Sequence, residues 1–333
     1  MPSLHNLPTE LLMETVKYYP VLLSNIDACV RGLPGDQFDG DDTLRALSQT
    51  CRALRDVFLP VLWERAHATV SARTRPKRRI RTRAKMLERR MRGIQKTPHV
   101  VPYIRHLAIT LEECNMGNWQ PMAHFIQVLD LLPALRSLTI YRISTEMIKV
   151  LETSCQGKLY PAIVTLAVPD ELAPILHCFP NVETLTVCNR GSWYPYSFPQ
   201  IPGKLFSAAK DHCKHIRTVN NLPLWVEAIN SFRKGIPNVQ HLSIWQNHHP
   251  DTLRLLEGMD NLSELVVRHG SRDYNNIRLP LEELIAAAER ILRSSKAPRH
   301  KVLRVQHLLE GQSDDIVREE TLIVVGGRAS YPS

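Results

Sequence analysis

Apolar residues recur in one pattern along most of the chain. Seven segments carry an apolar residue at their first and fourth positions, and all but one carry a third at the sixth. They start at Ile104, Leu135, Ile163, Val182, Ile216, Val239 and Leu262. The Ile216 copy lacks the third apolar residue. Short apolar segments bounded by turn residues predict strands. A proline two residues before five of the starts predicts a tight turn into each strand.

Helical signals fill the intervals between these strands. They cover residues 122–132, 144–154, 170–179, 204–213, 224–234 and 251–259. The strand starts advance by 19 to 34 residues, so one strand and one helix recur about every 26 residues. Units of this length cannot bury a helix face alone, and they form a core by stacking.

Residues 100–325 therefore resemble degenerate leucine-rich repeats, in which the asparagine typical of the position after the strand occurs once, at Asn247. The resemblance implies an α/β solenoid with parallel strands on the concave face and helices on the convex face. A doubly wound α/β enzyme is the competing interpretation. It is disfavoured because the chain has no GxGxxG, GxxxxGK[ST] or GxSxG motif. After the repeats, 279–295 predicts an amphipathic helix, and 301–309 and 321–325 predict closing strands.

The first sixty residues follow a helical period instead. Pro8 suits the first turn of a helix, and Pro20 ends the apolar pattern that begins there. A second stripe predicts one continuous helix of about four turns, carried by Leu44, Leu47, Cys51, Leu54 and Phe58. Pro60 is expected to break this helix before a further turn that carries Trp63.

These N-terminal motifs resemble an F-box. The similarity rests on LPTELL from Leu7, CRALR from Cys51 and LPVLW from Leu59. The stretch CRALRDVFLPVLWE is especially similar to F-box proteins abundant in mushroom-forming fungi. The family's module is a helical bundle that docks on the Skp-type adaptor subunit of a cullin–RING ubiquitin ligase. The resemblance implies adaptor-binding residues Leu7, Pro8, Leu11, Leu12, Leu47, Leu54, Leu59 and Trp63. Some of these must build the bundle instead, and the sequence does not separate the two sets.

The resemblance covers residues 4–68, with an inserted loop expected at about 24–42. We expect a basic helical linker at 69–99, the repeats at 100–325 and a flexible tail at 326–333. The acidic insertion lacks EF-hand spacing, and the His/Cys cluster around Cys213 lacks further ligands, so no metal is predicted. The seven scattered cysteines include no CxxC pair and indicate reduced thiols, without a disulfide framework.

The net charge of +9 comes from one segment. Residues 73–92 hold eleven Lys and Arg and one Glu, a net of +10, which leaves −1 for the remainder. A solvated helical linker is the favoured interpretation, and a nuclear-localisation signal is the alternative. Such a signal would use Arg75, Lys77, Arg78, Arg79, Arg81 and Arg83. The segment has no aromatic residues for stacking on bases, so nucleic-acid binding is not expected.

Two places are candidates for substrate binding. The segment 190–202 lengthens one repeat and is rich in aromatic residues and proline, and a second site follows the strand that starts at Val239. The candidate residues are Trp193, Tyr194, Tyr196, Phe198, Trp245 and Asn247. The alternative is that the aromatic side chains fold back to cover the repeats.

The function predicted from these resemblances is substrate recognition in an SCF-type ubiquitin ligase. The F-box would bind the adaptor, and through it the cullin, while the repeats bind a protein substrate. No catalytic residue or cofactor is expected. A scaffold outside any ligase and a nuclear protein associated with nucleic acid are the alternatives. Without a signal peptide or a long apolar stretch, the sequence predicts no membrane association and an intracellular protein, in cytoplasm or nucleus.

Overall fold

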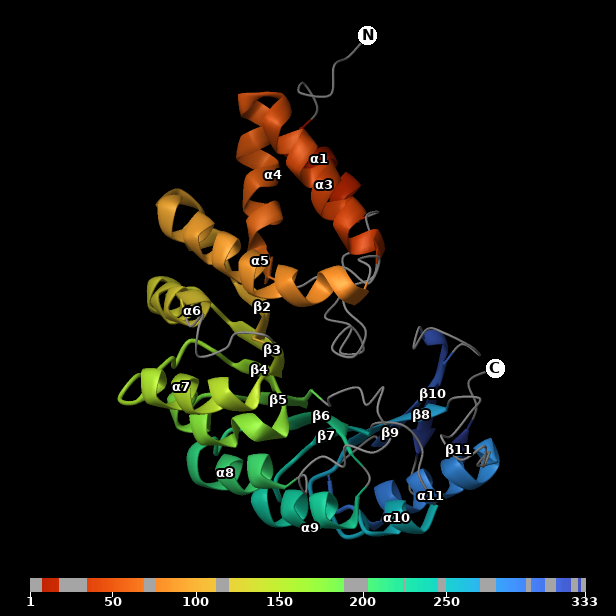
Figure 1. Ribbon diagram of the computed structural model, residues 1–333. Coiled ribbons are helices and arrows are strands. Elements are labelled where there is room, and N and C mark those ends of the chain that lie inside the picture. Colours follow the sequence, from red (N-terminus) through yellow and green to blue (C-terminus); the bar gives the residue numbers. More distant parts are fainter. Residues whose placement is uncertain are drawn as a thin grey trace. The chain divides into compact units, whose positions relative to one another are not determined.

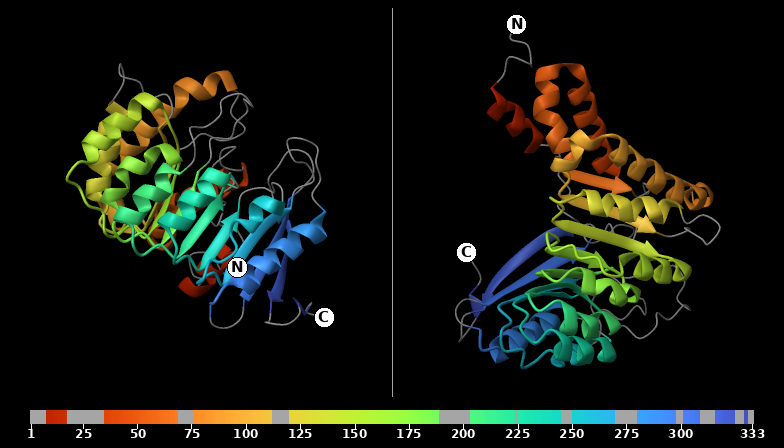
Figure 2. Two further views of the ribbon diagram at one scale, coloured as in Figure 1. Left: turned by 90° about the horizontal axis from the view of Figure 1, so that it is seen from below. Right: turned by 90° about the vertical axis from the view of Figure 1, so that its left-hand side faces the viewer.

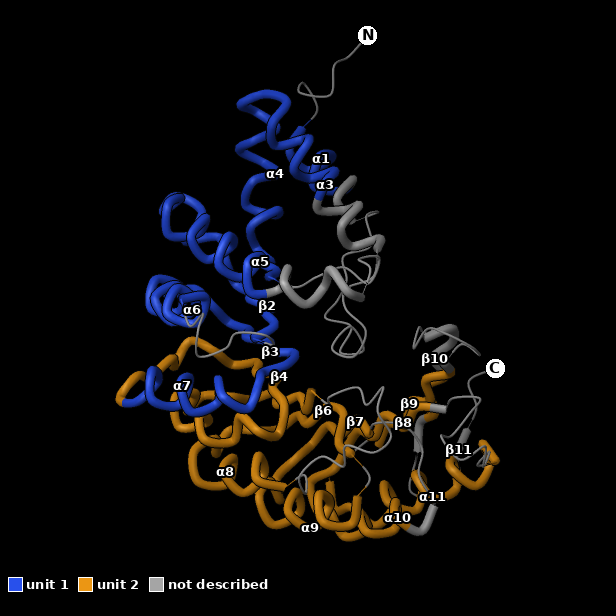
Figure 3. Tube along the Cα trace, viewed as in Figure 1, with its two compact units in different colours: residues 1–156 blue, residues 157–333 orange. Residues whose placement is uncertain are grey.

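A computed structural model describes residues 8–17, 35–68, 76–111, 120–188, 203–223, 225–244, 250–269, 280–297, 301–308, 316–324 and 329–330 of the 333-residue chain. The fold is mixed α/β, with helices and a mostly parallel set of strands (Figure 1). The chain divides into two compact units, residues 1–156 and 157–333 (Figure 3). The division falls inside the predicted repeat region, and the domain boundaries proposed from sequence stay predictions.

The N-terminal unit begins with helices and continues into alternating strands and helices. Its elements are α1 Thr9–Lys17, α3 Gly35–Thr50, α4 Arg52–Glu64, β1 Arg65–Ala68, α5 Pro76–Lys96, η2 Pro98–Tyr103, β2 His106–Leu111, α6 Gln120–Leu131, β3 Ser137–Ile143 and α7 Thr145–Cys155. Strand β1 pairs in parallel with β2, and β2 pairs in parallel with β3.

The C-terminal unit alternates strands with helices and ends in an antiparallel ribbon. Its elements are β4 Thr165–Val168, η3 Asp170–Cys178, β5 Thr184–Val187, α8 Lys204–His212, β6 Thr218–Leu222, α9 Val226–Gly235, β7 His241–Ile244, α10 Pro250–Arg254, β8 Glu264–His269, α11 Leu281–Ser294, β9 Lys301–Leu308, β10 Ile316–Val324 and β11 Ala329–Ser330. Strands β4 to β9 are parallel neighbours in chain order, and β10 and β11 reverse direction.

This topology is compatible with an α/β solenoid. A doubly wound sheet reverses its strand order at a switch point, whereas strands β4 to β11 follow the chain order throughout. Within the C-terminal unit, α8, α9 and α10 follow one another along the same face of the strands (Figures 1 and 2). None of the helices in the described part of the chain is long and apolar enough to span a membrane.

All seven predicted repeat strands are present, and each begins two residues after the start read from the sequence. The first and fourth residues of every copy are buried; in the Leu135 copy these are Leu135 and Leu138. The backbone also repeats. The N–H of Leu135 donates to the Leu132 carbonyl at 3.2 Å, and Ile163 donates to Tyr160 at the same distance, so these two proline-containing turns close in the same way. The apolar pattern therefore predicted strand position and facing correctly.

The copy with the polar sixth residue is accommodated by a β-bulge. Asn221 occupies that position, has φ of 59° and is fully buried. The register between β6 and β7 shifts after Val219, so that Leu222 pairs with Ile244. Asn tolerates the left-handed conformation better than most residues, and the extra residue brings Leu222 into the core in its place.

Three local expectations near the N-terminus were wrong. The continuous helix is interrupted at Cys51, which is extended (φ −153°, ψ 170°) between α3 and α4. Helix α4 runs through Pro60 to Glu64, because one missing backbone donor near a helix end is outweighed by packing of the same helix face. The loop expected up to residue 42 is helical from Gly35; its acidic residue types suit the N-terminal end of a helix.

The basic segment also differs from a solvated linker. It is helical, as expected, but the second half of α5 packs firmly, with Leu87, Met91 and Ile94 fully buried. Residues 65–68, which carried no strand prediction, form β1 beside β2. Helix α5 therefore connects two parallel strands as a repeat helix would.

Neighbouring repeats of the C-terminal unit are joined through a helix end. A single carboxylate oxygen of Asp170 accepts the N–H groups of Gly203 and Leu205, each at 3.2 Å, at the start of α8. Burial raises the pKa of Asp170 above its usual 3.8, while the two backbone donors oppose that shift. The next helices approach closely: a Cβ on Gly235 would lie 2.2 Å from the Phe206 carbonyl oxygen.

We expect Asp170→Asn to keep both hydrogen bonds through its amide oxygen and to be at least as stable as the wild type at pH 7, because no buried charge remains. Asp170→Ala should lose about 1 kcal/mol through the missing cap. Because the folded-state pKa is raised, any advantage of the Asn variant is present above that pKa. It should vanish as pH falls towards 3.8. Thermal unfolding at several pH values measures this, and an advantage that grows on acidification contradicts it.

We expect Gly235→Ala to destabilise the protein by about 1–3 kcal/mol, because the new methyl group meets backbone that cannot move aside. Gly93→Ala in α5 is the matched control. Nothing lies within 4 Å of the Cβ that it adds, so the same change there should stabilise by roughly 0.5–1 kcal/mol. Denaturant unfolding of both variants measures the two effects.

Candidate docking surface on the N-terminal helices

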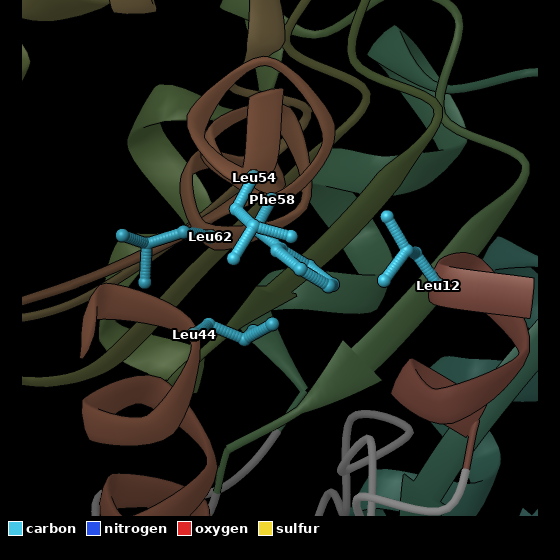
Figure 4. Packing of buried hydrophobic residues seen from close by; sticks show 5 residues of the cluster. All are labelled: Leu12, Leu44, Leu54, Phe58 and Leu62. Atoms are coloured by element: carbon cyan, nitrogen blue, oxygen red, sulfur yellow. The ribbon is translucent and has the colours of Figure 1, made fainter. Parts of the chain in front are cut away.

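Helices α1, α3 and α4 share a small apolar core. Its buried members are Leu12, Leu44, Leu54, Phe58 and Leu62, and their side chains converge between the helices (Figure 4). Leu54, Phe58 and Leu62 recur every four residues and so share one face of α4. Each fully buried side chain of this kind contributes roughly 1.5–3 kcal/mol, enough to hold three short helices together.

The break at Cys51 makes the α3–α4 corner. The Arg55 N–H donates to the Cys51 carbonyl at 3.0 Å as α4 begins, and Arg55 Nε donates to the Ser48 carbonyl at 3.1 Å across the corner. Ser48 and Thr50 hydroxyls bond carbonyls one turn back within α3. The corner therefore rests on polar bonds, while the apolar stripe continues past it from Leu47 to Leu54.

Helix α1 has one buried apolar residue with an exposed apolar residue on either side of it in sequence. Leu12 is 3% exposed, whereas Leu11 is 53% and Met13 is 38% exposed. Pro8, at the start of the helix, is also exposed. Leu11 and Met13 are about 160° apart around the helix, so they flank the buried Leu12 and do not form one contiguous patch.

The structure thus sorts the eight predicted adaptor-binding residues. Leu12 and Leu54 belong to the core, and Pro8 and Leu11 are exposed. The partly buried ones are Leu47, Leu59 and Trp63, of which Leu47 and Trp63 pack against the core. The guanidinium of Arg90 lies 4.5 Å from the centre of the Trp63 ring. Leu7 lies outside the described residues.

Met13 was missed in the sequence analysis. It directly follows Leu11-Leu12, and a helix cannot bury three consecutive residues on one face, which was the available signal. Two further exposed apolar residues were also missed, Trp225 (43%) and Val226 (49%), where α9 begins.

The structure describes only some of the other residues that the sequence singled out. Trp193, Tyr194, Tyr196, Phe198, Trp245, Asn247 and Arg75 lie outside the described residues. Lys77, Arg78, Arg79, Arg81 and Arg83 lie in the first half of α5.

The strands of the C-terminal unit carry a polar network. Glu264 joins His241 Nδ1, at 2.9 Å, to Arg304 Nε, and so links β7, β8 and β9. Farther along the same strands, the buried Arg268 donates from Nε to Gln306 Oε1 at 3.1 Å. These side-chain hydrogen bonds join the strands laterally.

Titratable groups elsewhere are explained by packing. Burial, with the positive charges of Arg90 and Arg65 nearby, lowers the pKa of His67 to about 4. Burial raises the pKa of the Cys213 thiol to about 12, and its Sγ donates to the Phe179 carbonyl at 3.4 Å. In the described part of the chain, no three His, Cys, Asp or Glu residues gather where they could hold a metal ion.

Comparison with known proteins leaves the chain without a family assignment. No protein-family model matches the sequence, and no curated protein matches it significantly.

We expect Leu12→Ala to destabilise the three-helix cluster by about 2–4 kcal/mol or to release α1 from it, because it opens a cavity among Leu54 and Phe58. Leu11→Ala, one residue away on the exposed side, should change stability by no more than about 0.5 kcal/mol. Denaturant unfolding of both variants tests the assignment. Equal losses would mean that Leu11 is also buried in solution.

Proposed function

We propose that the protein is the substrate-recognition subunit of an SCF-type cullin–RING ubiquitin ligase. The observation that carries the proposal is the exposure pattern of helix α1, in which Leu12 is buried in the helical core while Leu11 and Met13 are exposed to solvent. This arrangement falls in the segment whose LPTELL, CRALR and LPVLW motifs resemble an F-box. A soluble helix that exposes such side chains is well suited to bind an apolar groove on an adaptor.

The proposed mechanism is proximity. The N-terminal helices bind the Skp-type adaptor and through it the cullin, and the leucine-rich-repeat-like region binds a protein substrate. Tethering the substrate beside the charged ubiquitin carrier raises its effective concentration, so the chain contributes no catalytic group of its own. The protein acts inside the cell, in cytoplasm or nucleus.

A scaffold that binds partners but joins no ligase is the second candidate. The 24–42 insertion, which lengthens the F-box-like segment, favours it. A nuclear role for the basic segment is the third candidate. Because Leu87, Met91 and Ile94 are buried, helix α5 helps to build the core, which weakens the argument for a nuclear role.

We expect the full chain, co-expressed with the adaptor subunit, to form a stable complex on size exclusion. Leu11→Asp should weaken adaptor binding at least about 100-fold, because a carboxylate would enter an apolar contact. Leu159→Asp is the matched control. Leu159 is 65% exposed and lies in the C-terminal unit, so the same substitution there should leave the complex intact.

The variant at Leu12 is unsuitable for this purpose, because a charge there would disrupt the core. Circular dichroism must show that both Asp variants remain folded. Absence of a complex with the wild-type chain, or equal losses in both variants, would reject the ligase assignment. A complex that dissolves at moderate salt would instead indicate binding through the basic segment.

A further inference from the structure

A cluster of lysine and arginine residues lies at one edge of the C-terminal unit. The turns that lead into β6, β7 and β8 meet at the same edge, because these strands are parallel neighbours. Five exposed cations occupy the turn into β6 and the last turns of α8 and α9: Lys210, Lys214, Arg217, Arg233 and Lys234. We call them the basic band. They are separate in sequence from residues 73–92.

The basic band is not neutralised internally. None of its five members forms an ion pair with a carboxylate of the described residues, although Asp211 and Glu227 lie between them in sequence. Nearby cations behave differently: Arg293 pairs with Glu289 at 2.8 Å and Lys296 with Asp260 at 3.0 Å. Arg233 is held in place by donating from Nη1 to the Leu255 carbonyl at 2.8 Å.

A hollow of about 200 Å³ lies at the end of the basic band. Arg233, Asn238, Gly258, Asp260 and Asn261 line it. Asn238 Oδ1 accepts a hydrogen bond from Asn261 Nδ2 at 3.2 Å, so the Asn238 amide hydrogens are not used in that bond, and Asp260 pairs with Lys296. A guanidinium beside amide donors matches the acceptor geometry of carboxylate and phosphate groups.

Helix polarity explains only part of this arrangement. Cations in the last turn of a helix interact favourably with its dipole, which accounts for Lys210, Arg233 and Lys234. Lys214 and Arg217 follow the helix, and the dipole requires neither them nor the hollow. The charge therefore exceeds what the fold needs.

We propose that the basic band binds an acidic segment of a protein partner, with one carboxylate or phosphate group seated in the hollow at Arg233. Strands β6 to β8 span about 10 Å at the usual strand spacing. That length matches about three or four extended residues, so a short cluster of Asp, Glu or phosphorylated side chains fits. If the ligase assignment holds, this segment belongs to the substrate.

Nucleic acid is the less suitable anion. A bound strand needs a longer track of cations than the five of the basic band. The band is short and ends in an open hollow lined in part by planar polar groups. These features favour a few side chains over a continuous phosphate backbone.

The test measures binding of a fluorescein-labelled heptaglutamate peptide to the full chain by anisotropy. The band triple variant is Lys214→Gln, Arg233→Gln and Lys234→Gln. The matched control loses the same charge at Lys204, Arg290 and Arg293, which are exposed and lie outside the band. A third variant, Arg78→Gln, Arg79→Gln and Arg81→Gln, reports on the basic segment. Thermal unfolding verifies that each variant is folded.

We expect the band variant to weaken heptaglutamate binding at least about tenfold and the control to weaken it less than about twofold. A phosphoserine peptide and inorganic phosphate as competitors distinguish phosphate from carboxylate recognition. Equal losses in the band and control variants, or a loss confined to the third variant, would overturn the proposal. Tighter binding of heptathymidylate would assign the band to nucleic acid and also overturn it.

Adaptor binding is measured on the same band variant. If that complex forms normally while peptide binding is lost, the two activities are separable. If the wild-type chain binds the peptide but not the adaptor, the basic band stands and the ligase assignment fails.

Discussion

The fold depends on lateral pairing between successive copies of one strand. The Arg105 carbonyl accepts the N–H groups of Arg136 and Ser137, and the Arg217 carbonyl accepts those of Gln240 and His241. Each copy thereby fixes the register of the next. A fixed register places the apolar first and fourth residues of each copy on the face that the helices cover. The same backbone hydrogen bonds therefore set both the strand pairing and the side chains that enter the core.

The strands were predictable from the sequence because burial selects residue types at a short and regular spacing. All seven starts follow from apolar positions such as Leu135 and Leu138, and the turns follow from the prolines that precede them. The bulge at Asn221 was not predictable. The pattern shows that an apolar residue is missing, but the register shift that brings in Leu222 depends on pairing with Ile244 in a later repeat. A one-dimensional period holds no information about that partner.

Breaks and continuations of helices were less predictable, since several weak effects compete there. Pro60 removes one hydrogen bond, which local rules treat as a stop, yet Phe58 and Leu62 on either side both reach the core and keep α4 continuous. Cys51 carries no breaking signal, and the corner depends on Arg55 reaching the Ser48 carbonyl. Tertiary contacts decided both positions, against the local preference. The burial of the second half of α5 likewise depends on tertiary structure, because the helix connects the parallel strands β1 and β2.

The candidate docking surface shows the same limit at the level of single residues. Sequence motifs identified the segment but could not separate Leu11 from Leu12, because both are leucine in the same motif. Their separation comes from the direction of each side chain on α1, where about 100° of helical rotation takes one into the core and leaves the other exposed. The basic band was hidden for a related reason. Arg233 is distant in sequence from Lys210 and Lys214, and the three form no charge run; parallel pairing of β6 with β7 brings the segments that carry them to one edge. Residues 73–92 form a conspicuous charge run in the sequence, yet part of that run belongs to helix α5 and packs through its apolar residues. The five cations of the basic band, none of them paired with a carboxylate of the described residues, come together through the topology of the strands.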